Sequence, residues 1–191
     1  MLESPPVRAN VLVGKKPSVG RPQEFEGDEW SFLLDPAFSY GMDLIGKITE
    51  RLTKRDFKPP RHDIFDWVLF YRLQMVYLLL WSCIERYTAL AYGPNLNPEE
   101  RIRRLGADKS FRFSLSKCNI RSKREISDTR DPTKKIYLDP DDPPSSAKYY
   151  YQVRHNLSHR GKGALNDGEI VRDSLKELYE IFNRMLRQSP N

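Results

Sequence analysis

The longest apolar run in this chain, WVLFYRLQMVYLLLWSCI at residues 67–84, constrains the fold more than any other feature. A helix built from it is apolar on nearly every side, which is typical of a central, buried helix. Arg72 and Gln74 lie in its middle, so a core helix accounts for the run better than a membrane span does. We therefore expect a helix over about residues 63–92, ended by the Gly-Pro pair that follows.

Other segments predict further helices around this one. Apolar residues recur every three or four positions over 38–54 and 168–187. Another helix is expected to begin at a capping serine, Ser145 or Ser146, and to end near His159. A shorter helix is expected over 98–105. The sum is an all-α fold, a four-helix up-and-down bundle whose last two helices form an antiparallel pair.

Two segments fall outside this pattern. Residues 1–35 begin with several prolines and predict an extended N-terminal arm, either a tail without fixed structure or an arm that wraps a partner subunit. Residues 107–146 interleave basic and acidic side chains, and we expect a mostly irregular, mixed-charge insertion with one or two short elements. The insertion lies between the second and third main helices of a domain over 36–190.

Charge and cysteine content give weaker indications. The net charge of +6 favours an acidic partner such as nucleic acid without requiring one. Cys83 and Cys118 form no spaced framework, which fits a reducing compartment, and Cys83 is expected to be a buried free thiol. The first ten residues contain no apolar segment typical of a signal peptide. We expect a cytoplasmic protein that does not use a membrane.

The stretch YYYQVRHNLSHRGKG at residues 149–163 concentrates cations beside two histidines. On a continuous helix, His155 and His159 are about 40° apart, a spacing that metal ligands also use. The stretch contains no carboxylate, however, and Arg154, Arg160 and Lys162 would repel a divalent cation. We therefore expect no metal site and no cofactor here.

Arg154 and His159 are about 140° apart on the same helix, so they do not share a face. They meet either if the helix unwinds near its end or if two copies of the chain pair across a two-fold axis. Both arrangements create a cationic cleft that suits a phosphate, with an imidazole that moves protons near neutral pH. Asn156 and Ser158 are placed to add hydrogen bonds. Alternatively, Arg154 forms an ordinary core ion pair with Glu85, and the histidines are surface residues.

The order arginine, polar residue, three further residues, histidine resembles the motif of the HEPN superfamily, the higher eukaryote and prokaryote nucleotide-binding domains, in its RNase-type members. The segment YLLLWSCIERYTALAYG is similar to their long second helix, and the final amphipathic helix also fits. The resemblance covers roughly residues 36–190, with the 107–146 insertion unmatched.

The resemblance implies a metal-independent endoribonuclease that acts at a homodimer cleft. It implies that Arg154 holds the scissile phosphate, that His159 transfers protons, and that His155 occupies the supporting polar position, where asparagine or aspartate is more usual. Glu85 would orient Arg154 from the neighbouring helix. Gly161 stands where members silenced by a nucleotidyltransferase antitoxin have a tyrosine, so such control is not expected.

RNA contacts are expected from Arg160, Lys162 and Tyr150, although three consecutive tyrosines cannot all face one way on a helix. The implied biology is a toxin or antiviral defence effector, with RNA as substrate and a possible antitoxin or sensor protein as partner. The alternative from another class is a catalytically inactive HEPN-like module that binds RNA, a nucleotide or a protein. A third possibility is a structural subunit with an apolar dimer face.

Overall fold

A computed structural model describes residues 36–54, 64–120, 123–128, 130–159 and 167–187. These residues form six helices and a two-stranded antiparallel sheet, so the mainly helical fold is confirmed. The elements are α2 (Pro36–Thr53), α3 (Ile64–Tyr92), α4 (Pro98–Ala107), α5 (Lys109–Ser116), β1 (Arg124–Ser127), β2 (Lys135–Leu138), α6 (Pro143–His159) and α7 (Gly168–Arg187). The predicted arm over 1–35 lies outside the described residues.

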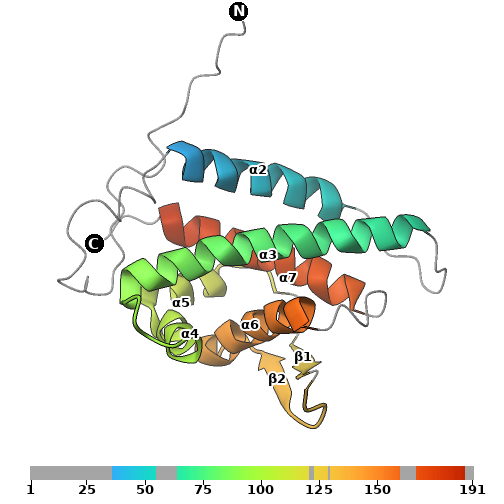
Figure 1. The fold of residues 1–191 in the computed structure, drawn as a ribbon. Coiled ribbons are helices and arrows are strands. Elements are labelled where there is room, and N and C mark those ends of the chain that lie inside the picture. The colour runs from blue at the N-terminus through green and yellow to red at the C-terminus, as the bar shows by residue number, and fades with distance from the viewer. Residues whose placement is uncertain (1–35, 55–63, 121–122, 129, 160–166, 188–191) are drawn as a thin grey trace, which may run out of the picture.

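Helix α3 is the centre of the molecule. It packs against α2, α4, α6 and α7, and Figure 1 shows it between α2 on one side and the α4–α6 layer on the other. Its stretch Val68–Tyr92 is the one helix among the described residues that is long and apolar enough to cross a membrane, a property that buried core helices share. Leu73 and Leu80 in this stretch are completely buried against the neighbouring helices.

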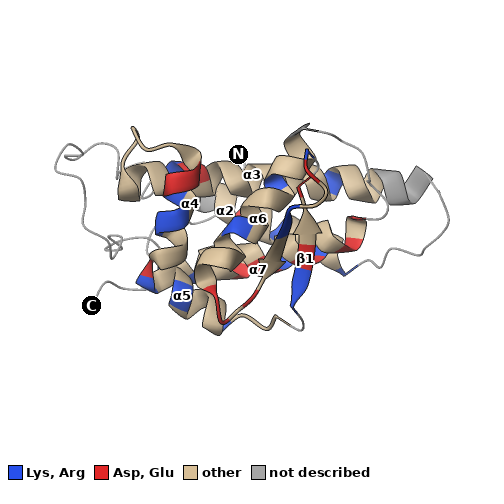
Figure 2. Ribbon diagram, turned by 90° about the horizontal axis from the view of Figure 1, so that it is seen from below, with Lys and Arg blue, Asp and Glu red and all other residues tan. Residues whose placement is uncertain are grey.

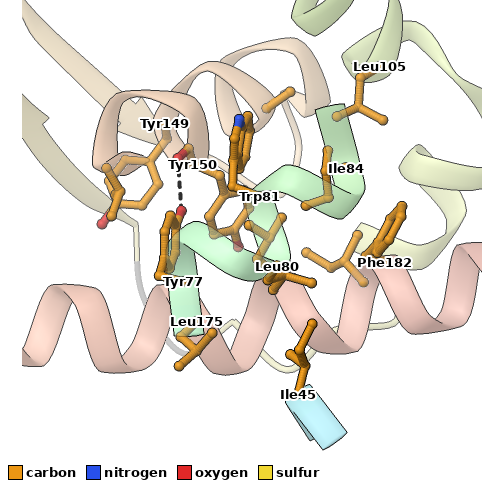
Figure 3. Close-up of a cluster of buried hydrophobic side chains, with 14 of the residues drawn as sticks. Ile45, Tyr77, Leu80, Trp81, Ile84, Leu105, Tyr149, Tyr150, Leu175 and Phe182 are labelled. Atoms are coloured by element: carbon orange, nitrogen blue, oxygen red, sulfur yellow. Dashed lines mark hydrogen bonds between the residues drawn. The ribbon is translucent and has the colours of Figure 1, made fainter. Parts of the chain in front are cut away.

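Large buried side chains of α2, α4, α6 and α7 meet those of α3 (Figure 3). Trp81 and Tyr77 of α3 are 1% and 0% exposed, and the hydroxyl of Tyr77 donates a 2.8 Å hydrogen bond to the backbone carbonyl of Tyr150 on α6. A buried hydroxyl needs such a partner to offset its lost hydration. This bond therefore links α3 to α6 inside the core.

Residues 107–146 are more ordered than their composition indicated. They contain α5 and the β1–β2 hairpin, in which Ile126 pairs with Ile136. Phe111 and Leu115, four residues apart on α5, are buried, as are Ile126 and Leu138 of the hairpin. The expectation of a mostly irregular insertion was wrong because each short element buries only one or two apolar side chains, too few to stand out from the surrounding charges.

An ion-pair network attaches the hairpin to α7. Arg124 at the start of β1 pairs with Glu177, lies 3.5 Å from Asp173, and places its guanidinium over the ring of Tyr149 at 5.9 Å. The hydroxyl of Tyr150 donates to the same Glu177 carboxylate at 3.1 Å. Burial still raises the pKa of Glu177 above its ordinary value, so desolvation outweighs the attraction of Arg124.

Helix α6 packs chiefly against α4 and the hairpin, whereas α7 packs against α2, α3 and α5. The last two helices therefore touch each other less than an antiparallel pair would.

The close approach of α4 to α6 depends on Gly106, where a Cβ atom would lie only 2.6 Å from the Cα of Pro144. Helix α6 also begins at Pro143, with Asp142 accepting from the backbone N–H of Ser145, so the cap is an aspartate and not a serine.

Candidate functional site around Arg154

The end of α6 carries the residues that the sequence singled out. Arg154, His155, Asn156 and Ser158 lie on this helix, which ends at His159 as expected. The side chain of His159 lies outside what the structure describes, as do Arg160 and Lys162 entirely. The described part of the site is therefore the face of α6 up to Ser158, together with the part of α3 that it contacts.

Arg154 forms an ion pair with Glu85 on α3. The Nη2 atom of Arg154 lies 3.0 Å from Oε1 of Glu85, and the side chains are 26% and 43% exposed. The same carboxylate oxygen accepts the indole N–H of Trp81 at 3.0 Å, because Trp81 and Glu85 are one helical turn apart. Glu85 is thus held by its own helix and can orient Arg154. The pairing confirms the predicted contact, which both the orienting role and an ordinary ion pair require.

Tyr151 forms an aromatic wall beside the ion pair. Its ring lies 5.7 Å from that of Trp81 and 6.3 Å from that of His155, measured between centroids. The guanidinium carbon of Arg154 is 6.0 Å from the centre of the Tyr151 ring, within reach of a cation–π contact. Arg154 is therefore fixed from two directions while about a quarter of its side chain stays exposed.

Of the three consecutive tyrosines, the half-buried Tyr151 is the one that borders the site. Tyr149 and Tyr150 are 0% exposed, and the Tyr150 hydroxyl bonds to Glu177 on the opposite side of α6. A base cannot reach a completely buried ring, so the prediction that Tyr150 contacts RNA was wrong. Consecutive residues on a helix point about 100° apart, and the sequence alone did not identify which of the three faces outward.

Asn156 has a structural contact of its own. Its Nδ2 donates to the backbone carbonyl of Ser127 at the end of β1 at 3.0 Å, and its Oδ1 accepts from Gln152 at 2.8 Å. The amide thus joins α6 to the hairpin and points away from the Glu85 side. Ser158, by contrast, is exposed and lies one helical turn after Arg154, on the same face.

Two contributors were missed by the sequence analysis. Trp81 orients Glu85, and Tyr151 supports Arg154. The four-residue spacing of Trp81 and Glu85, and the three-residue spacing of Tyr151 and Arg154, are the signals that mark such neighbours on a helix.

The described residues contain no group of three or more His, Cys, Asp or Glu side chains that could hold a metal ion.

Cys83 and Cys118 are free thiols, both half-buried, so Cys83 is less buried than expected. Burial raises the pKa of both thiols. Neither residue approaches the character of a reactive thiolate.

Comparison of the chain with family models, curated proteins and solved structures found no match in any of the three. The resemblance to HEPN domains therefore depends on the motif and on the order of the helices.

Proposed function

We propose that this protein is a metal-independent endoribonuclease of HEPN type that acts as a homodimer. The four long helices α2, α3, α6 and α7 would form the bundle, with the hairpin, α4 and α5 added to it. The observation that carries the proposal is the guanidinium group of Arg154, which is held between Glu85 and Tyr151 near the end of α6 while about a quarter of the side chain stays exposed. A fixed cation that still faces solvent is suited to binding a phosphate.

In the proposed reaction, the 2′-hydroxyl of a nucleotide attacks the adjacent phosphorus. The bond from O2′ to phosphorus forms as the bond from phosphorus to O5′ breaks, which yields a 2′,3′-cyclic phosphate and a free 5′-hydroxyl. His159 accepts the proton of the 2′-hydroxyl, or returns one to the leaving O5′. Arg154 offsets the negative charge that grows on the phosphate oxygens. No metal ion or cofactor takes part.

A row of exposed apolar side chains on α3 supports the homodimer. Val68, Tyr71, Met75 and Leu79 are 42%, 53%, 70% and 51% exposed, and their spacing places them on one face of the helix. At 100° per residue, Glu85 lies at the edge of this row on the side that faces α6. Two chains that pair through the row would therefore bring their two Arg154 side chains to the rim of one shared interface.

An inactive binding module is the alternative function, favoured by one observation. Arg154 already has a carboxylate partner, as a purely structural arginine would. Such a module would keep the fold and bind RNA, a nucleotide or a protein without cleaving.

A cleavage assay decides between the two. Purified full-length protein should cut a mixed RNA pool in the presence of EDTA, and His159→Ala should cut it roughly 10²–10⁴-fold more slowly, the usual contribution of a general acid or base. Arg154→Ala should show a similar loss. Arg184→Ala, which removes a half-buried arginine paired with Glu180 on α7, is the matched control and should remain active. Equal, undetectable cleavage by wild type and His159→Ala would favour the binding module.

A further inference from the structure

A cavity of about 460 Å³ lies between the β1–β2 hairpin, α4 and α6, next to the Arg154 site. Ligand pockets for small molecules usually measure about 300–1,000 Å³. Helix α6 lines the cavity with Lys148, Tyr151 and His155, which share one face because they are three or four residues apart. The hairpin contributes Arg130 and Lys134 from the opposite side.

The cavity has an excess of positive charge. Figure 2 shows basic residues on both α6 and the adjoining hairpin. Lys135, which also lines the cavity, pairs with Glu125 across the hairpin. Arg130, Lys134 and Lys148 are exposed, and no ion pair of their side chains occurs within the described part of the chain. Three such cations around one hollow favour an anionic ligand.

Glu99 and Asp128 are the acidic residues that line the cavity. One oxygen of Asp128 is engaged by the backbone N–H of Arg130 at 2.9 Å, so this carboxylate shapes the loop of the hairpin. Glu99 is an exposed residue in the first turn of α4. The two carboxylates only partly offset the four cations that line the cavity, so the lining keeps a net positive charge.

Tyr151 joins the cavity to the Arg154 site. One part of its ring contacts Trp81 and Arg154, and the residue also lines the cavity. Burial raises the pKa of Tyr151, and the carboxylates of Glu85 and Glu99 add to the rise, whereas the positive charges of Arg154 and Arg130 act to lower it. A ligand that spans the two sites would follow this ring.

We propose that the cavity is a nucleotide subsite, which takes a nucleoside phosphate of the same RNA strand whose neighbouring linkage is held at Arg154. The phosphate contacts Lys134, Lys148 and Arg130, and the base or ribose packs against Tyr151 and His155. An aromatic wall beside several cations is the combination that single-stranded nucleic acids recognise. This inference rests on the proposed function, and it assigns the hairpin and α6 a role in choosing and positioning RNA.

The test measures binding apart from cleavage. The probe is a fluorescein-labelled 2′-O-methyl RNA strand of about ten nucleotides, a length within the usual range for single-strand sites. It cannot be cut by 2′-hydroxyl attack, so fluorescence anisotropy with the full-length protein reports affinity alone. The test variant is Lys134→Glu/Lys148→Glu. The control is Lys109→Glu/Lys117→Glu, at the start of α5 and directly after its end, which changes the net charge equally at two exposed positions.

Reversing the two cavity lysines should weaken binding roughly ten-fold and flatten the slope of log Kd against log salt by roughly 1.4, since each lost phosphate contact removes about 0.7 for a single strand. The α5 control should bind within about two-fold of wild type, because a distant charge contributes only screened attraction. Equal weakening by both variants, or none in either, would overturn the subsite.

Free AMP and UMP distinguish a strand from a mononucleotide. If they compete with the RNA probe, and the competition is lost in Lys134→Glu/Lys148→Glu, the cavity holds a nucleotide unit of the strand. If they bind there without displacing RNA, the cavity serves a free nucleotide and the strand proposal fails.

Failure of the subsite and failure of the proposed function give different results. If the cavity variant cleaves RNA with an unchanged KM while His159→Ala is inactive, the nuclease proposal is supported and the subsite is rejected. If wild-type protein binds the probe through the cavity but cuts no RNA, the subsite is supported and the nuclease proposal is rejected.

Discussion

The Nη2 atom of Arg154 lies 3.0 Å from Oε1 of Glu85, which joins α6 to the central helix at the candidate site. The contact orients a cation without burying it. An ion pair with side chains 26% and 43% exposed adds little to stability, since exposed pairs contribute about 0–1 kcal/mol. The main effect of the pair is to fix the orientation of Arg154. A substitution at Glu85 should therefore affect cleavage more than stability if the carboxylate orients Arg154.

Replacing Glu85 by Gln should lower cleavage more than it lowers stability. The amide retains an oxygen for the Trp81 N–H but loses the charge that holds Arg154. We expect kcat to fall about ten-fold, with less than about 1 kcal/mol change in the free energy of unfolding. Steady-state kinetics and urea unfolding measure the two quantities, and Glu180→Gln on α7 is the control. An unchanged kcat would leave Glu85 as an ordinary ion-pair partner.

Placing a charge on the exposed α3 row should separate the proposed dimer. Met75 is 70% exposed, so Met75→Glu leaves the core of one chain intact. A carboxylate in an apolar interface should raise the dimer dissociation constant at least about ten-fold, because the charge loses its hydration there. Light scattering after size-exclusion chromatography gives the mass.

The control for this variant is Leu44→Glu, which changes an equally apolar residue of α2 that is 43% exposed and outside the row. It should not alter the mass. A wild-type protein that is monomeric at every concentration, or a Met75→Glu variant that dimerises normally, would contradict the assignment of this face.

Replacing Gly106 by Ala should destabilise the fold. The added methyl group would lie 2.6 Å from the Cα of Pro144, and backbone atoms cannot move aside as a flexible side chain can. Overpacking of this kind costs about 1–3 kcal/mol. In contrast, Gly41→Ala meets nothing within 4 Å and should stabilise α2 by about 0.5–1 kcal/mol. Urea unfolding of both variants measures the difference, and the same sign for both would contradict this packing.

Replacing Arg124 by Met should destabilise the protein in a pH-dependent manner. The pKa of Glu177 is already raised by burial, and the loss of Arg124 raises it further. A carboxyl group whose folded pKa exceeds its unfolded value of 4.5 binds protons more readily when folded. Its stability contribution is therefore complete at low pH and is lost as the pH rises from about 4.5 through the folded pKa.

We expect Arg124→Met to cost about 3 kcal/mol at pH 7.5, the usual effect of removing one partner of a buried pair, and distinctly less at pH 5. Urea unfolding at both values checks this, with Arg184→Met as a control. This change breaks the more exposed pair with Glu180, whose side chains are 40% and 41% exposed, and should cost under about 1 kcal/mol. A cost that grows as the pH falls would show that Glu177 is not the group responsible.

Helical periodicity predicted much of the secondary structure. The helices expected over 38–54, 63–92 and 168–187 correspond to α2, α3 and α7, with ends within two residues. The short helix at Pro98 is α4, which runs two residues beyond the predicted end. These predictions succeed because helix formation depends on neighbours three and four residues apart, which local sequence contains.

The hairpin was the main omission. Each of its strands has four residues, and Ile126 and Leu138 are its buried side chains. A two-stranded ribbon is marginal by itself. It forms here because Arg124 pairs with Glu177 of α7 and because Asn156 of α6 donates a hydrogen bond to the carbonyl of Ser127 at the end of β1, contacts that local composition does not contain.

The sequence by itself determined where the long helices lie and which of their residues carry cations and imidazoles, because amphipathic spacing and residue chemistry are local properties. Only the tertiary structure decided that Tyr151, and not Tyr150, borders the site, and that Trp81 and Tyr151 hold the predicted pair of Glu85 and Arg154 in place. Those outcomes depend on how α6 is rotated and on how closely it crosses α3 and α4. Rotation and crossing are set by packing between residues far apart in the chain, such as Gly106 with Pro144 and Tyr77 with Tyr150.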